Sequence, residues 1–143
     1  MKIRLVMLGK TKRPELRALF ADYVGRIERA CEITVSDLRE PTEAALARLK
    51  IDTAAHIVLL DAGGREHTSQ EFARWLGALR DRGARELVFL CGNDIGFPAA
   101  FRKHAKEAIS LSKLTMPHEL ARVVLAEQIY RALAILSGHP YAK

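Results

Sequence analysis

Three short runs of mostly hydrophobic residues are spaced along the first two thirds of the chain. They are 3–8 (IRLVML), 55–60 (AHIVLL) and 87–91 (LVFLC). Apolar runs of this length, bounded by turn residues, are typical of strands that are buried on both faces of a sheet. Residues 33–38 instead alternate apolar and polar positions, which predicts an edge strand. After the second run we expect a turn at Gly63 and Gly64.

Helical periodicity separates these runs. Pro14 opens a segment whose apolar residues recur at helical spacing as far as Ile27, and a shorter helix is predicted after Pro41. Thr68 and Glu71 form a capping box, which marks the start of a further helix. Strands that alternate with helices predict an α/β domain whose parallel sheet carries helices on both faces.

The last third of the chain departs from this pattern. A short strand and loop over 108–114 lead into a long helix from about His118 to Leu136, and apolar residues occupy most of its circumference. Such a helix must be buried on more than one side. In a chain of 143 residues we expect a second subunit to supply that burial, and hence a homodimer. Helical spacing alone points to Leu125 and Leu133 as positions at the contact, with burial in the protomer's own core as the alternative.

Composition narrows the classes of function. The length fits one domain over 1–143, and no linker or repeat divides it. The net charge is +6, with the excess at the two ends, and this fits either a nucleic-acid partner or an ordinary basic surface. Cys31 and Cys91 are isolated, so we expect two buried thiols and neither a disulfide framework nor a metal site. The apolar start is too short for a signal peptide or membrane span, which predicts a cytoplasmic protein.

The candidate ligand-binding segments follow the carboxyl ends of the predicted parallel strands. Ligands in such sheets bind beyond the carboxyl ends of the strands, and the segments 60–64, 91–96 and 111–117 are expected there. Gly92 and Gly96 would allow a close backbone approach or a positive φ. CGNDIG is not a dinucleotide-binding fingerprint, and an ordinary strand-to-helix turn stays open as the alternative.

The C-terminal segment 108–143 resembles a known family. It reads AISLSKLTMPHELARVVLAEQIYRALAILSGHPYAK, and it is similar to the signature of the RlmH family of SPOUT methyltransferases, SLSxLTxPHxLxRVxLAEQxYRA followed by a terminal HPY. The resemblance extends over essentially the whole chain. It implies a trefoil-knotted fold with the knot at about 87–143, S-adenosylmethionine (SAM) as cofactor, and a homodimer. The implied reaction is methylation of N3 of a pseudouridine in large-subunit ribosomal RNA within the assembled ribosome.

The resemblance also implies a cofactor pocket. Its residues would be Leu60, Gly92, Asn93, Gly96, Leu111, Ser112, Lys113, Leu114, Thr115, Met116 and Pro117. The family usually has GGPEG where this chain has GNDIG. Because Asn tolerates positive φ, we expect Asn93 to preserve the shape of the loop.

The candidates for the chemistry are His118, Arg122 and Tyr141. His118 begins the long helix, whose N-terminus favours a neutral imidazole able to accept a proton. Arg122 is expected to clamp a phosphate or to stabilise negative charge on the base, with pairing to Glu119 as the alternative. Tyr141 suits stacking on a base.

At the chain's end, His139 and Lys143 are the predicted RNA contacts, and by resemblance this tail reaches the partner subunit's site. Two other functions are left open. They are a SPOUT enzyme with another RNA target, and a non-catalytic ribosome-binding or assembly protein.

Overall fold

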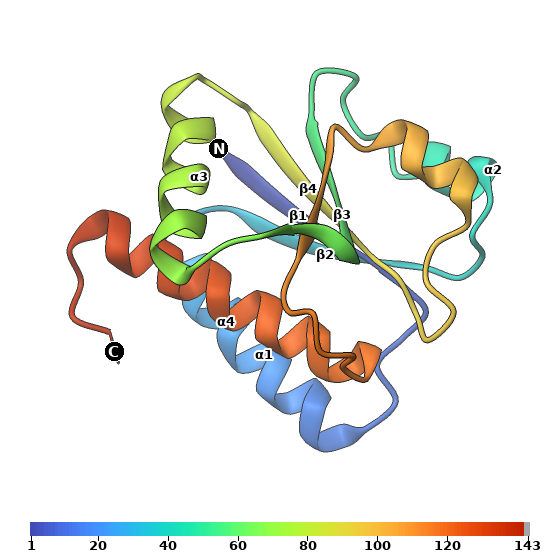
Figure 1. Ribbon diagram of the computed structural model, residues 1–143, viewed down its shortest axis with the longest axis horizontal. Helices are drawn as coiled ribbons and strands as arrows, with labels where there is room; N and C mark the ends of the chain where they lie inside the picture. The colour runs from blue at the N-terminus through green and yellow to red at the C-terminus, as the bar shows by residue number, and fades with distance from the viewer. Residues whose placement is uncertain (142–143) are drawn as a thin grey trace.

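All the strands in the described part of the chain belong to one parallel sheet. The computed structural model describes residues 1–141, and Figure 1 shows the sheet with strand order β2-β1-β4-β3-β5. The strands are β1 (Lys2–Leu8), β2 (Ile33–Leu38), β3 (His56–Glu66), β4 (Glu86–Cys91) and β5 (Glu107–Ser110). Every residue of β4 is buried. The predicted buried strands therefore lie inside the sheet, and the predicted edge strand β2 lies at an edge.

Helices cover both faces of this sheet, as the sequence predicts. One face carries three helices (Figure 1), which are α1 (Pro14–Glu28), α3 (Ser69–Asp81) and α4 (His118–Ser137). The other face carries the short helix α2 (Glu43–Arg48) and the 3-10 helix η1 (Ala99–His104), which contribute Leu46 and Phe101 to a second apolar cluster. The capping box of α3 is present, with Thr68 and Glu71 bonded reciprocally.

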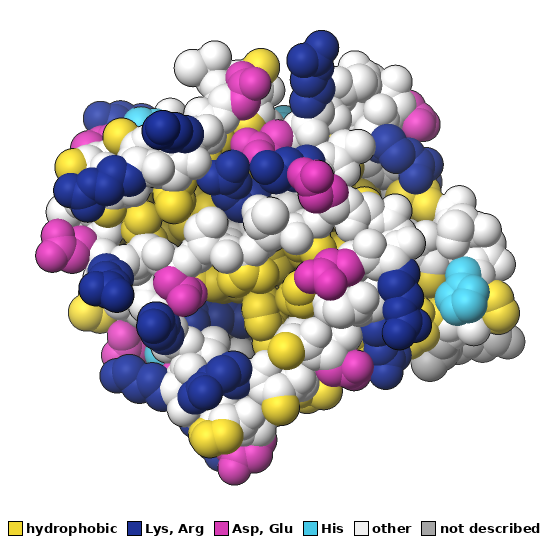
Figure 2. Space-filling model, turned by 180° about the vertical axis from the view of Figure 1, so that it is seen from behind, with side chains coloured by type: hydrophobic (Ala, Val, Ile, Leu, Met, Phe, Trp, Pro, Cys, Tyr) yellow, Lys and Arg dark blue, Asp and Glu magenta, His cyan; other side chains and the backbone are white. Residues whose placement is uncertain are grey.

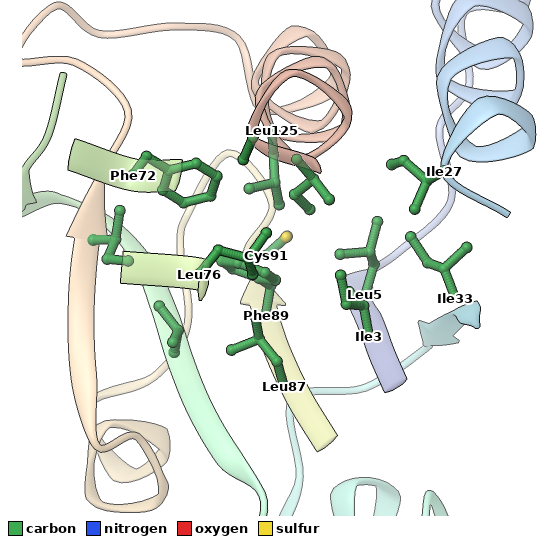
Figure 3. Packing of buried hydrophobic residues seen from close by; sticks show 14 of the residues in the cluster. Ile3, Leu5, Ile27, Ile33, Phe72, Leu76, Leu87, Phe89, Cys91 and Leu125 are labelled. Carbon is green, nitrogen blue, oxygen red and sulfur yellow. The ribbon is translucent and has the colours of Figure 1, made fainter. Parts of the chain in front are cut away.

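The larger apolar core lies between the sheet and the three helices. Figure 3 shows Phe72 and Leu76 of α3 and Leu125 of α4 packed over Leu5 and Phe89 of the central strands. Leu125 is fully buried in this core. The prediction that Leu125 lies at a subunit contact is therefore wrong, because its side of α4 faces the protomer's own sheet. Leu133 is partly buried against the same cluster.

The turn predicted at Gly63 and Gly64 is also wrong. β3 runs through both glycines to Glu66 and pairs with β5, with a shift of register between Leu60 and Arg65. A Cβ on Gly64 would lie 2.6 Å from the carbonyl carbon of Ala108. Gly64 therefore permits a close backbone approach inside the sheet, which the sequence pattern does not distinguish from a turn.

Some apolar positions that the sequence assigns to the core are exposed. Val35 on β2 is 40% exposed and Leu19 on α1 is 43% exposed. Ile27 is the fully buried residue of α1.

Cys91 is buried, as predicted, whereas Cys31 is only half-buried. Figure 2 views the molecule from the side opposite to Figure 1. It shows a hollow lined with hydrophobic side chains and surrounded by charged ones.

Residues 1–141 contain neither a membrane-spanning helix nor a cluster of metal ligands. Within residues 1–141, none of the helices combines the length and hydrophobicity that spanning a membrane requires. In the same part of the chain, no group of three or more His, Cys, Asp or Glu side chains is arranged to hold a metal ion.

Candidate cofactor pocket

A cavity of about 320 Å³ opens at the carboxyl edge of the sheet. Its walls come from the ends of β3, β4 and β5 and from the first turns of α4, so segments far apart in sequence meet there. This volume lies at the lower end of the range for small-molecule sites. The lining residues are Leu60, Asp61, Ala62, Cys91, Gly92, Asn93, Asp94, Ile95, Gly96, Leu111, Ser112, Leu114, Thr115, Met116, His118, Ala121 and Arg122.

Most of the predicted cofactor residues line this cavity, together with His118 and Arg122. Lys113 and Pro117 do not. Lys113 is exposed with its Nζ 3.6 Å from Glu66 Oε1, and Pro117 caps the start of α4. The lining residues that our prediction omitted are Asp61, Ala62, Cys91, Asp94, Ile95 and Ala121. All but Ala121 lie in the segments that the strand ends had already indicated, and Ala121 follows His118 by three residues on one helix face.

The loop after β4 is a tight turn. A Cβ on Gly92 would lie 2.9 Å from Gly96 Cα, and Gly96 has a φ of +80°. The amide of Gly96 donates to the carbonyl of Asn93 at 2.9 Å. Both glycines thus have the roles expected of them.

Asn93 supports this loop in a different way from the one predicted. Its φ is not positive. Its side-chain Oδ1 instead accepts a hydrogen bond from the amide of Ile95 at 3.0 Å, which is an Asx-turn. The loop therefore keeps a compact shape without the family's usual second glycine.

Two hydrophobic side chains stand at the pocket with little cover from the protomer. Ile95 is 88% exposed and Leu114 is 78% exposed. The loop that carries Leu114 is held by Ser112, whose Oγ accepts from the amide of Leu114 at 2.9 Å. These exposed apolar side chains suit contact with a flat, partly apolar ligand, which would remove them from water.

Arg122 is buried beside the pocket, with only 1% of the residue exposed. Its Nη2 donates to the carbonyl of Leu8 at 2.8 Å, and its Nη1 donates to Thr11 Oγ1 at 3.1 Å. Its Nε is buried without a partner among the described residues. Both terminal nitrogens of Arg122 thus hold the loop between β1 and α1, while its predicted roles, clamping a phosphate or stabilising charge on the base, stay predictions.

Glu119 holds the same loop. Its carboxylate accepts from the amides of Lys12 and Arg13, each at 3.0 Å. These two backbone bonds, more than any other influence, lower the pKa of Glu119 below its ordinary value. The alternative that Arg122 pairs with Glu119 is replaced by an arrangement in which both side chains bind one loop.

The pocket's ionisable lining includes His118 and Cys91. The His118 side chain is about one third exposed, and its Nε2 lies 3.9 Å from Glu119 Oε2. Burial raises the pKa of the Cys91 thiol to about 12, so this cysteine stays protonated and unreactive. Of these two residues, His118 is the one suited to accept a proton near neutral pH.

Tyr141 lies away from the pocket. Its hydroxyl donates to Glu127 Oε1 at 3.4 Å, its ring packs edge-on against Tyr130 with centroids 4.7 Å apart, and the Arg131 guanidinium lies 4.9 Å from its centroid. Burial is the main cause that raises the pKa of Tyr141, so its hydroxyl stays protonated at neutral pH.

The tail and the pocket lie on different parts of α4. Glu127 follows His118 by nine residues, which is about 14 Å along the helix and about half a turn around it. His139 is exposed and, with Tyr141, lines a second cavity of about 470 Å³. Lys143 lies outside the described residues. One protomer therefore does not bring His118 and the tail together.

Comparison with known proteins assigns this architecture to a class. Residues 1–142 match the family described as "Predicted SPOUT methyltransferase". A methylase-family protein of Haemophilus influenzae Rd KW20 superposes with a TM-score of 0.60 at 10% identity, over 99% of this chain and 70% of that one. A methyltransferase of Legionella pneumophila, solved with bound SAM, superposes with a TM-score of 0.51 at 12% identity, over 92% and 66%. The chain is a SPOUT-class protein.

Closer relatives define the family. Two proteins named "Ribosomal RNA large subunit methyltransferase H" are similar over nearly their whole length. The one from Koribacter versatilis is 42% identical over 99% of this chain and 97% of the relative, and the one from Latilactobacillus sakei is 35% identical over the full length of both. This chain belongs to the large-subunit methyltransferase H family, RlmH.

Proposed function

We propose that this protein transfers a methyl group from SAM to N3 of a pseudouridine in large-subunit ribosomal RNA. The pocket carries the proposal, because it joins the three strand-end loops to His118 at the edge of a SPOUT sheet. Relatives that are 35 to 42% identical over nearly the whole chain are named as methyltransferases of large-subunit ribosomal RNA. The proposal places the enzyme with ribosomes in the cytoplasm, and it includes the knotted chain path over 87–143.

The residues present fit SAM. Glycine at position 92 lets the loop 92–96 fold tightly against its own backbone at Gly96, and all five residues of this loop line the cavity. Leu60, Leu111 and Met116 supply apolar surface for an adenine ring. SAM, when bound, supplies a methyl group already activated on a sulfonium, so the protein needs only to align the acceptor and remove one proton.

The chain's own residues would perform the second task. His118 lies at the pocket, where its imidazole can accept the N3 proton of the base as the new bond to carbon forms. It is the first residue of α4, so it directly follows the loop 111–117. Arg122 acts as a positioning residue, because it ties the first turns of α4 to the loop after β1.

A homodimer completes this site. Within one protomer Tyr141 lies against Glu127 and Tyr130, on another side of α4 from His118. A second copy packed against α4 can bring its own Tyr141 and His139 to the base. Leu120 and Ile135 are exposed apolar residues on α4 that such a contact would cover.

The deciding experiment uses ribosomes that lack the modification. Incubation with the protein and SAM labelled on its methyl group should place label on one pseudouridine of the large-subunit RNA, as mapped by nuclease digestion and mass spectrometry. His118→Ala should bind SAM with similar affinity but transfer methyl at least about 100-fold more slowly, the scale of a lost general base.

Other outcomes would favour the other two functions. If the labelled methyl group appeared on transfer RNA alone, the protein would be a SPOUT enzyme with a different RNA target. Absence of SAM binding in calorimetry, with the protein still bound to ribosomes, would make it a non-catalytic ribosome-binding protein.

A further inference from the structure

The loop between β1 and α1 carries a cluster of exposed cations. Lys10, Lys12 and Arg13 are all exposed, and none of the three has an ion-pair partner among residues 1–141. Arg17, one turn into α1, donates to the carbonyls of Thr11 and Lys12 at 3.3 and 3.2 Å. Lys and Arg side chains gather on the lower left of Figure 2, the side on which this loop lies once the view of Figure 1 is turned.

Unlike most surface loops, this one is anchored to a buried framework. Glu119 accepts from the amides of Lys12 and Arg13, and Arg122 donates to Leu8 and Thr11. Both anchoring side chains are almost fully buried. Four hydrogen bonds to α4 therefore fix the loop from which the three cationic side chains extend. Pre-organised charges bind a polyanion without the entropy cost of ordering the loop.

The loop lies directly beside the cofactor pocket. Met7 of β1 pairs with Cys91 of β4, so the residues after β1 emerge next to the loop 92–96. The first turns of α4 separate the two, with His118 and Arg122 lining the pocket on one side and Arg122 contacting Thr11 on the other. A helix with its side chains is about 10 Å across. An RNA strand advances by roughly 3.4 Å or more per nucleotide, so about three nucleotides would span the width of this helix.

We propose that Lys10, Lys12 and Arg13 bind backbone phosphates of the RNA strand whose base enters the pocket of the same subunit. Glu119 and Arg122 are the positioning residues that hold this loop in place. The inference rests on the proposed function and extends it, because it assigns an RNA contact within the protomer in addition to the tail. An acidic protein surface is the competing partner, and the experiment below separates the two.

The test compares two triple variants of equal charge. In Lys10→Gln/Lys12→Gln/Arg13→Gln, KM for ribosomes lacking the modification should rise by roughly tenfold or more. The magnitude of the negative slope of log affinity against log salt should fall by about 2, at about 0.7 for each lost phosphate contact. SAM affinity in calorimetry should stay at the wild-type value, since these side chains do not line the pocket.

The matched control removes three exposed arginines elsewhere. Arg29 follows α1, and Arg82 and Arg85 precede β4. All three therefore lie toward the amino ends of the strands, at the opposite end of the sheet from the pocket. Arg29→Gln/Arg82→Gln/Arg85→Gln should change KM less than threefold. An equal loss in both variants would mean that net charge alone acts, and would overturn the proposal. Wild-type KM and salt slope in the loop variant, with the wild-type protein active, would overturn it as well.

A crosslink separates RNA from protein as the partner. When the protein carrying a photoreactive amino acid at position 12 is bound to the same ribosomes and irradiated, it should crosslink to ribosomal RNA. A crosslink that maps to ribosomal protein alone would overturn the phosphate assignment. Failure of the wild-type protein to methylate any ribosomal RNA would instead refute the proposed function, so the two failures are distinguishable.

Discussion

At the scale of single residues, three polar side chains beside the pocket hold loops in place through hydrogen bonds that their sequence context does not indicate. Asn93 does not take the positive φ that its residue type allows, and it stabilises its loop through its side-chain oxygen. Arg122 and Glu119 are not a pair but two anchors of one distant loop. Their partners lie more than 100 residues away in sequence, so no local pattern could have identified them.

Glu119 gives a pH dependence that can be checked. Its pKa is lower in the folded protein than the unfolded value of about 4.3, so it stabilises the fold above that value and loses this effect as pH falls through its folded pKa. Glu119→Gln should therefore have a lower free energy of unfolding than the wild type at pH 7, and the gap should narrow in acid. Urea unfolding between about pH 3 and pH 7 measures this.

The control is Glu28→Gln, at an exposed glutamate of α1. It should alter stability little at any of these pH values. A gap between wild type and Glu119→Gln that stays constant down to pH 3 would show that the carboxylate's charge does not support the loop.

At the scale of elements, the junction of β3 and β5 determines the position of the pocket's third wall. β5 leads directly into the loop 111–117, and β3 carries Leu60 at the point where the register shifts. Gly64 lets the two backbones approach after that shift. Sequence patterns predict the strands that flank this junction but place a turn where the strand in fact continues.

Two neighbouring glycines test this junction. In Gly64→Ala the new Cβ would lie 2.6 to 2.7 Å from backbone atoms of Ala108 and Ile109, which cannot move without separating the strands. We expect a loss of at least about 2 kcal/mol in the free energy of unfolding. In Gly63→Ala the nearest atom is a side-chain oxygen of Asp61 at 3.6 Å, so the change should stay within about 0.5 kcal/mol. Equal effects in urea unfolding would contradict the close approach.

At the scale of the whole molecule, the candidate residues divide into two groups on α4. His118 and the strand-end loops form one group, and Tyr141, Tyr130 and Glu127 form the other. Because these groups face different sides of the helix, a complete site needs the second group from another copy. This arrangement also explains why apolar residues surround α4, since the sheet covers one side of the helix and a partner is expected on another.

Subunit mixing tests this arrangement. His118→Ala and Tyr141→Ala should each abolish methylation alone. Mixed in equal amounts under conditions that allow exchange, half of the dimers become heterodimers with one intact site each, so activity should recover to about a quarter of the wild-type value. The measurement is labelled methyl transfer to ribosomes. A mixture as inactive as its components would show that both residues act within one subunit.

By itself the sequence determined the order of the strands and α-helices, the capping box of α3 and the loops that line the pocket, but not the 3-10 helix η1. Each of these depends on local periodicity, turn residues or the rule that parallel strands end at one edge. The tertiary structure alone decided that Leu125 is core, that Gly64 lies inside the sheet, and that Arg122 and Glu119 hold the loop after β1. These outcomes depend on which distant backbone groups need a partner or a space, and this information exists only after the chain has folded.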